Sequence, residues 1–365
     1  MSVLSSGRRR RTMKGEGSAG LVIIGVDLGG TNVRAAAVDR GGRLLTEPVE
    51  NPSEATAGFD RTLAAIAGTV REAIRAAGLA APDIGAIGMA VPGHVDGEKG
   101  IVRWTPNFGE TRAGVFEAWR DVPLGPAVER ELGCPVFMGN DANLAALGEY
   151  RFGSGRGRAQ GLVLLTLGTG IGGGVVLTRT QIQGPAAWER GVLLVGANGG
   201  GAELGHTIVL AGGPRCGCGA GGCLEALANR DAVVARARDK LRHAGESRLA
   251  ERCGGDVGRL TPRLLAEAAA EGDELAREVW DETGEYVGIG VANFINTFNP
   301  EVVAIGGQIA KAGEPLFRAI RRAARDHAIP TLFEICRIVP AERIDDAGIL
   351  GGAALAASLA PRPAT

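Results

Sequence analysis

The 365-residue chain has few aromatic residues and no excess charge of either sign. Phe, Trp and Tyr make up only 4% of it, and 40 Lys and Arg balance 41 Asp and Glu. Nucleic-acid binding depends on a basic face that attracts phosphate, so the balanced charge argues against a dedicated nucleic-acid-binding protein. The best apolar runs, residues 21–26 and 162–167, are far shorter than the ~20 residues of a membrane span. No membrane partner is therefore expected.

The sequence also lacks the apolar core of a signal peptide. Arg8 to Arg11 resemble the charged start of one, but the next apolar run ends at Asp27 after a few residues. We expect residues 1–20 to form a disordered basic tail, with Met13 an alternative start. Without an export signal the expected compartment is the cytoplasm, where the six cysteines would be reduced thiols or metal ligands.

Glycine is the residue present in excess, with 59 copies, more than twice the usual share of about 7%. It follows no G-X-Y period, and a hydrophobic content of 45% is enough for a large core. The chain is therefore expected to be globular, and its length predicts about two domains.

Strand-like and helix-like segments alternate along the chain, which predicts an α/β architecture. Residues 162–177 repeat the pattern of residues 21–38, an apolar run, a glycine turn and a second apolar run, so we expect two related halves. Residues 109–119 and 178–188 lack periodicity and are interpreted as loop insertions. The predicted helices cover residues 56–78, 142–152, Glu274–Phe298, 315–327 and 349–359, and further strands cover Ile84–Val91, 136–138 and 302–305.

The two glycine turns are candidate phosphate-binding loops, because backbone N–H groups approach phosphate closely only where no Cβ intervenes. Neither turn has a Walker A lysine, and neither opens a helix as a dinucleotide-binding fingerprint does. Tight turns without a ligand are the alternative, although two matching turns favour phosphate. The candidate residues are Asp27, Gly29, Gly30, Thr31, Asn32, Gly168, Thr169 and Gly170.

Asn140 and Asp141 stand between a predicted buried strand and a helix. A carboxylate there can act as a general base toward a substrate hydroxyl. Taken alone, the pair is better explained as a cap of the following helix.

His206, Cys216, Cys218 and Cys223 form the most specific motif. One His and three Cys make a closed tetrahedral shell for structural zinc, and the intervening glycines allow a short loop. A disulfide would leave one of the three thiols unpaired. Glu203 and Glu225 flank this motif and could bind polyol hydroxyls, or they could be ordinary surface glutamates.

These motifs together resemble the ROK (repressor, open reading frame, kinase) family, in order and from Leu21 to Leu359. Gly306-Gly307 resembles the family's adenosine-side glycine pair, while Pro92-Gly93 and Pro106-Asn107 fall where the family contacts sugar. The resemblance implies the actin-like ATPase fold of sugar kinases, with two α/β domains around a central cleft. It places the N-terminal domain at residues 21–139 plus 346–360, and the C-terminal domain with its zinc loop at 140–345.

The resemblance further implies ATP-dependent phosphorylation of a hexose 6-hydroxyl, and within the family the match is nearest to glucokinases. Asp141 would accept the hydroxyl proton, and Asp27 would orient the Mg²⁺ that accompanies ATP. His206 would serve both zinc and sugar. The implied sugar-binding residues are Gly93, Asn107, Asn140, Asp141, Glu203, His206 and Glu225.

Two alternatives stay open. Fructose, mannose or N-acetylmannosamine could replace glucose, because the motifs do not determine the pocket shape around C2. A sugar-sensing regulator shares the same core, but only 26 residues precede Asp27, which is short for a DNA-binding domain. The resemblance suggests a homodimer.

Overall fold

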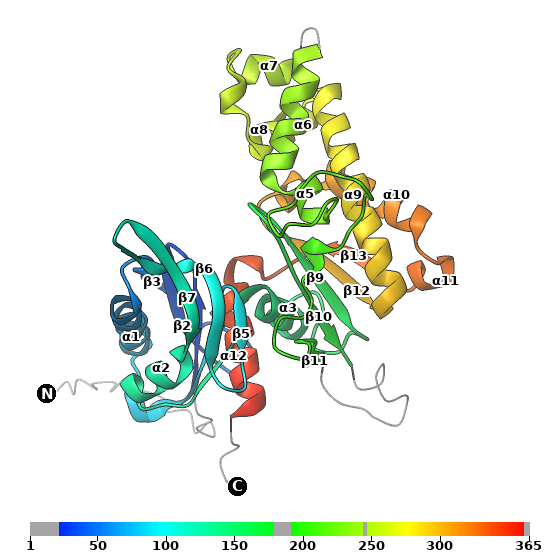
Figure 1. Cartoon of the computed structure of the whole chain (residues 1–365). Coiled ribbons are helices and arrows are strands. Elements are labelled where there is room, and N and C mark those ends of the chain that lie inside the picture. Colours follow the sequence, from blue (N-terminus) through cyan, green and yellow to red (C-terminus); the bar gives the residue numbers. More distant parts are fainter. Residues whose placement is uncertain (1–21, 179–190, 244–246, 361–365) are drawn as a thin grey trace, which may run out of the picture.

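The computed structural model describes residues 22–178, 191–243 and 247–360 (Figure 1). The predicted tail, residues 1–20, and all of the predicted insertion 178–188 except Thr178 lie outside these residues.

The first sheet has five strands in the order β3-β2-β1-β4-β8. β1 pairs antiparallel with β2 across the first glycine turn and parallel with β4, which pairs parallel with β8. The strands are β1 (Val22–Leu28), β2 (Asn32–Val38), β3 (Val49–Pro52), β4 (Ile84–Val91) and β8 (Val136–Asn140).

The second sheet repeats this pattern in the order β11-β10-β9-β12-β13. β9 pairs antiparallel with β10 across the second glycine turn and parallel with β12, which pairs parallel with β13. The internal repeat predicted from the sequence is therefore confirmed. The strands are β9 (Leu162–Leu167), β10 (Ile171–Leu177), β11 (Val192–Leu193), β12 (Val302–Gly306) and β13 (Arg337–Pro340).

Both faces of the second sheet are buried. Successive side chains of a strand point to opposite sides, so neighbouring residues of β9 enter two different cores. Val163 and Leu165 of β9 pack into a core with α9 (Glu274–Phe298) and α10 (Glu314–His327). Leu162 and Leu164 pack on the other side, into a core that includes α3 (Asp141–Phe152). This two-sided burial explains why the strand is a continuous apolar run.

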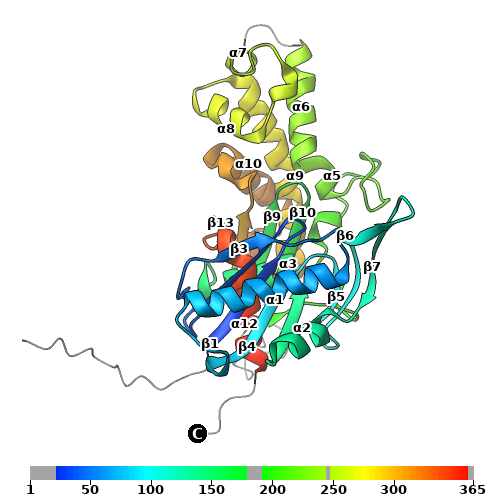
Figure 2. The ribbon, with the colours of Figure 1, turned by 90° about the vertical axis from the view of Figure 1, so that its left-hand side faces the viewer.

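α1 (Phe59–Ala76) packs on one face of the first sheet and α12 (Ala347–Leu359) on the other (Figures 1 and 2). α12 also packs against α3, so it lies between the first sheet and the helix that covers the second. Both contacts are very close: a Cβ on Gly88 of β4 would lie 1.8 Å from the Gly352 carbonyl oxygen, and one on Gly351 would lie 1.9 Å from that of Leu144. Glycine is needed there because no larger residue fits.

The predicted loop insertion at residues 109–119 is wrong, because these residues form a β-hairpin. β6 (Ile101–Arg112) pairs antiparallel with β7 (Val115–Val122), and β5 (His94–Asp96) completes a three-stranded sheet. Gly109, with Gly114 in the turn, interrupts the alternation that would have indicated a strand. Figure 2 shows this hairpin projecting from the first sheet.

The remaining helices were not predicted, because they are short or rich in charged residues. The helices that were not predicted are α2 (Leu124–Leu132), α5 (Leu224–Ala228), α6 (Arg230–His243), α7 (Arg248–Arg252), α8 (Pro262–Ala270) and α11 (Pro330–Phe333).

In the part of the chain that the structure describes, no helix is long and apolar enough to cross a membrane.

Candidate active site

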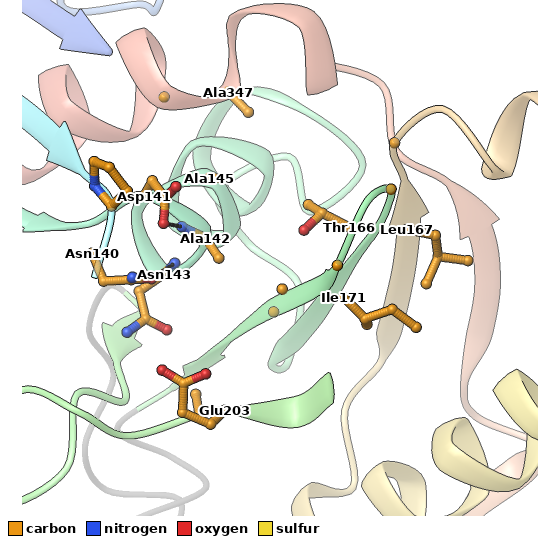
Figure 3. Close-up of a pocket in the computed structure, with 18 of the residues that line it drawn as sticks. Asn140, Asp141, Ala142, Asn143, Ala145, Thr166, Leu167, Ile171, Glu203 and Ala347 are labelled. Atoms are coloured by element: carbon orange, nitrogen blue, oxygen red, sulfur yellow. Dashed lines mark hydrogen bonds between the residues drawn. The ribbon is translucent and has the colours of Figure 1, made fainter. Parts of the chain in front are cut away.

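A cavity of about 780 Å³ brings together most of the candidate residues from both halves of the chain. Figure 3 shows Asp141 at the start of α3 on one side and Glu203 on another, with Thr166 and Ile171 of the second hairpin nearby. The predicted residues that line it are Asp27, Gly93, Asn107, Asn140, Asp141, Gly168, Gly170, Glu203, His206, Glu225 and Gly307.

Asn140 orders the strand end from which Asp141 enters the cavity. Its Oδ1 accepts a hydrogen bond from the Asn143 N–H at 3.0 Å, so Asn140 is the cap of α3. Its Nδ2 donates to the Gly93 carbonyl at 3.0 Å, which joins the cap to the turn after β4. The capping interpretation is therefore confirmed for Asn140, and it is compatible with a place in the cavity.

Asp141 and Asp27 are two acids in one cavity with raised pKa values. Burial raises the pKa of Asp141, although the Ala142 N–H, which donates to its Oδ1 at 2.8 Å, opposes this. Burial and the charge of Asp141 raise the pKa of Asp27 to about 6, against the attraction of Arg34. Carboxyls with raised pKa values in a cavity are typical of sites that take up protons or bind cations.

The first glycine turn is closed by a 2.8 Å hydrogen bond from the Gly29 N–H to the Asn32 carbonyl. Gly30 and Thr31 do not line the main cavity. They line a neighbouring one of about 550 Å³, which Asn107 shares. Asn32 donates to Glu50 at 2.5 Å and, like Gly29, shapes the turn.

The second glycine turn is closed by a 2.9 Å hydrogen bond from the Gly168 N–H to the Gly170 carbonyl, with Thr169 exposed at its tip. Gly307 lies against it, because a Cβ there would be 2.3 Å from the Leu167 carbonyl oxygen. Gly306 is the last residue of β12 and packs against Ile344, next to Gly307.

The side chains of His206, Cys216, Cys218 and Cys223 meet in one cluster, with their donor atoms all within 4.8 Å of one another. His206 Nδ1 lies 3.5 Å from Cys216 Sγ, and Cys218 Sγ lies 3.7 Å from Cys223 Sγ. Zinc–sulfur bonds of about 2.3 Å in a tetrahedron place the sulfurs about 3.8 Å apart, so the spacing of Cys218 and Cys223 suits zinc. Because Nδ1 faces the sulfurs, Nε2 is the nitrogen available to the cavity that His206 lines.

Lining residues that were not predicted include five polar, aromatic or glycine positions, and two of these had a local signal. Gln308 directly follows the Gly306-Gly307 pair, and Lys311 comes three residues later; Lys311 is the sole Lys or Arg among the described residues of this lining. The other three come from separate elements: Trp104 from the hairpin sheet, Asp345 from the turn before α12, and Gly348 from the first turn of α12. Only the tertiary packing brings them to the cavity.

Two sheets with the same strand order, joined at a cleft lined by both, define the class: the actin-like ATPase fold of sugar kinases. The fold expected from the sequence is thereby confirmed. The ROK family model matches residues 23–358. Glucokinase of Thermotoga maritima is 38% identical over 92% of this chain and 97% of its own length. The chain belongs to the ROK family.

Two solved structures of the family represent an enzyme and a regulator. A ROK family glucokinase from Streptomyces griseus, in complex with glucose and AMPPNP, has a TM-score of 0.70 and 32% identity, over 92% of this chain and 99% of that one. A ROK family transcriptional regulator, a homologue of the Escherichia coli MLC protein, has a TM-score of 0.76 and 29% identity, over 92% of this chain and 77% of that one.

Proposed function

We propose that this protein transfers the terminal phosphoryl group of ATP to the 6-hydroxyl of a hexose, with glucose as the first candidate. The observation that carries the proposal is the position of Asp141, which shares one cavity with the polar side chains of Glu203, His206 and Glu225 and with the second glycine turn. The glucokinase of Thermotoga maritima and the glucose complex from Streptomyces griseus support glucose as the acceptor.

On the sugar side, Asp141 is the proton acceptor. The raised pKa of Asp141 lies closer to neutral pH than that of a free aspartate, and general bases work best when their pKa lies near the working pH. The Ala142 N–H orients the carboxylate. Gly93, Asn107, Asn140, Glu203, His206 and Glu225 would hold the remaining hydroxyls, so that the 6-hydroxyl alone faces the donor.

On the donor side, the two glycine turns would hold the ATP phosphates through backbone N–H groups, and Gly306-Gly307 would face the adenosine. Mg²⁺ bound to ATP would neutralise charge on the phosphates. Asp27, ionised above its pKa of about 6, would orient that ion. Phosphoryl transfer has a loose transition state, so positioning and charge neutralisation supply most of the acceleration.

Zinc would have a structural role. His206, Cys216, Cys218 and Cys223 occupy all four positions of a tetrahedral shell and leave none open for a substrate. The ion would fix the ring of His206, so that Nε2 keeps a constant position toward the sugar.

The test is a panel of hexoses with ATP, scored by ADP release and by the position of phosphorylation. Glucose should give the highest kcat/KM, and the phosphate should be on the 6-hydroxyl. A higher kcat/KM for fructose, mannose or N-acetylmannosamine would replace glucose, and no turnover with any hexose would refute the kinase proposal.

The second candidate is a sugar-sensing regulator, which the TM-score of 0.76 with the transcriptional regulator supports. A regulator should bind operator-containing DNA in a sugar-dependent way and release no ADP. A kinase should show the opposite. We also propose a homodimer, for which sedimentation should give twice the mass of the chain.

A further inference from the structure

The Glu225 carboxylate contacts both the second glycine turn, which is proposed to bind phosphate, and the Cys/His cluster, which is proposed to bind zinc. Its Oε2 accepts a hydrogen bond from the Ile171 N–H, at the end of the second glycine turn, at 2.9 Å. Its Oε1 lies 3.6 Å from Cys216 Sγ in the Cys/His cluster. One side chain therefore joins the predicted phosphate turn to the metal-binding loop.

Gly170 is part of this contact. A Cβ at Gly170 would lie 2.7 Å from Glu225 Oε2, closer than a side chain tolerates, so the carboxylate can sit against the turn only because Gly170 has none. The glycine thus makes room for the carboxylate as well as for a phosphate.

The segment that carries Glu225 holds the turn at its other end too. The Arg230 N–H, at the start of α6, donates to the Gly168 carbonyl at 2.9 Å. The turn between Gly168 and Ile171 is therefore fixed at both ends by the stretch that begins at the metal ligand Cys223.

We infer that Glu225 is a positioning residue for the donor nucleotide, because it holds the second glycine turn in the shape that binds phosphate, and that it thereby couples the sugar site to the ATP site. The inference rests on the proposed function for the identity of both ligands. A hydrogen bond from an N–H to a carboxylate is about twice as strong as one between neutral groups, which suits an anchor. A sugar hydroxyl on the same carboxylate would alter this anchor, so sugar and nucleotide affinities become linked.

The experiment measures Mg-AMPPNP binding by calorimetry in the absence of sugar. Glu225→Ala removes the acceptor and should weaken binding by about 10-fold, within the usual range of coupling between sites. Glu225→Gln keeps an acceptor oxygen for the Ile171 N–H and should stay within about 3-fold of wild type, although its sugar KM rises. A role limited to the sugar would raise the sugar KM in both variants and leave AMPPNP binding unchanged.

A pair of glycine substitutions tests the same contact without changing Glu225. Gly170→Ala should displace the carboxylate and weaken Mg-AMPPNP binding more than Gly168→Ala does. Gly168→Ala is the matched control because it adds a Cβ to the same phosphate turn, where that Cβ meets only the Gly170 carbonyl oxygen, at 3.9 Å, and leaves Glu225 in place. Zinc content is measured in every variant, and if Glu225→Ala loses zinc the glycine pair decides.

Unchanged AMPPNP affinity in zinc-loaded Glu225→Ala would overturn the inference, and so would equal losses in the Ala and Gln variants. It also fails if wild type does not bind Mg-AMPPNP. A wild-type protein that binds AMPPNP but phosphorylates no hexose would instead refute the proposed function, and the nucleotide measurements would still be informative.

Discussion

Asp27 stands where the end of the first hairpin strand meets the last helix. Its carboxyl carbon would lie 2.4 Å from a Cβ on Gly348, so the acid packs directly on the first turn of α12. Arg34 approaches from the next strand but is shared with other acceptors, because it donates to the Asp345 carbonyl at 2.7 Å and lies 3.3 Å from Asp346. Asp27 is thus a partly buried acid whose charge is incompletely compensated.

Asp27→Asn should therefore stabilise the protein while it abolishes turnover. The pKa of Asp27 in the folded protein, about 6, lies above the 3.8 of a free aspartate, so the ionised acid disfavours folding. This cost is absent below pH 4 and complete above about pH 6. Removing the charge should raise the free energy of unfolding by about 1–3 kcal/mol at pH 7.5 and by less at pH 5. Urea unfolding at the two pH values measures it, and an equal gain at both would contradict this account.

Asp141→Asn should lose most of the turnover and keep sugar binding. The amide retains the shape of the side chain and its place at the start of α3, but it cannot accept the hydroxyl proton. A loss of about 10²–10⁴-fold in kcat is expected for a general base. Glucose affinity, measured by calorimetry, is the control, and a variant with near wild-type kcat would exclude Asp141 from the base role.

Single residues of the site were predictable where chemistry imposes a residue type. The cysteine thiols, the His206 imidazole and the carboxylates of the site were found in this way. Lys311 could have been found from its place shortly after Gly306-Gly307. Gly348 could not, because its importance comes from the backbone of α12 approaching Asp27, and no local pattern encodes that approach.

Among the elements, α12 is defined by close contacts on two sides. Its glycines bring its backbone against β4 on one side and α3 on the other. Helix propensity alone would favour alanine at such positions, so the glycines are retained for packing.

Gly351→Ala should destabilise the protein by 2 kcal/mol or more, as overpacking of a full core commonly costs about 1–3 kcal/mol. Gly68→Ala in α1 is the matched control. A Cβ there meets nothing within 4 Å, so it should stabilise the protein by about 0.5–1 kcal/mol through helix propensity. Thermal melts of both variants give the comparison, and a neutral Gly351→Ala would show that α12 can shift to make room.

Cys218→Ser should lose zinc and sugar binding together, because the cluster fixes His206 and the loop that leads to Glu225. Wild type should contain one zinc per chain by metal analysis. Cys336→Ser, outside the cluster, should keep it. No zinc in wild type, or normal glucose affinity in zinc-free Cys218→Ser, would contradict a structural role for the metal.

The elements that the sequence predicted well are those whose periodicity is undisturbed. α9 has the predicted bounds, 274–298, and β4 the predicted bounds, 84–91. The β6–β7 hairpin was missed because glycines interrupt it. α6 was missed because Val233 and Ala237 are its only buried residues, and two buried positions give too weak a period.

At the scale of the whole molecule, two copies of one sheet pattern meet at the cleft, and the domain boundaries near residues 139–140 and 345–346 remain predictions. If the halves are separate domains, glucose and AMPPNP together should close them and exclude water, as sugar kinases require to avoid ATP hydrolysis. Small-angle scattering should then show a smaller radius of gyration with both ligands than with either one. An unchanged radius would indicate a preformed cleft.

The position of α12 also constrains the order of folding. During synthesis the first sheet emerges long before the helix that covers its second face, so one side of that sheet remains open to water until the end of the chain appears. The second half, in contrast, has α3, α9 and α10 available as soon as its own strands are complete. We therefore expect the N-terminal half to reach its native structure last, and to depend on chaperones until α12 has been synthesised.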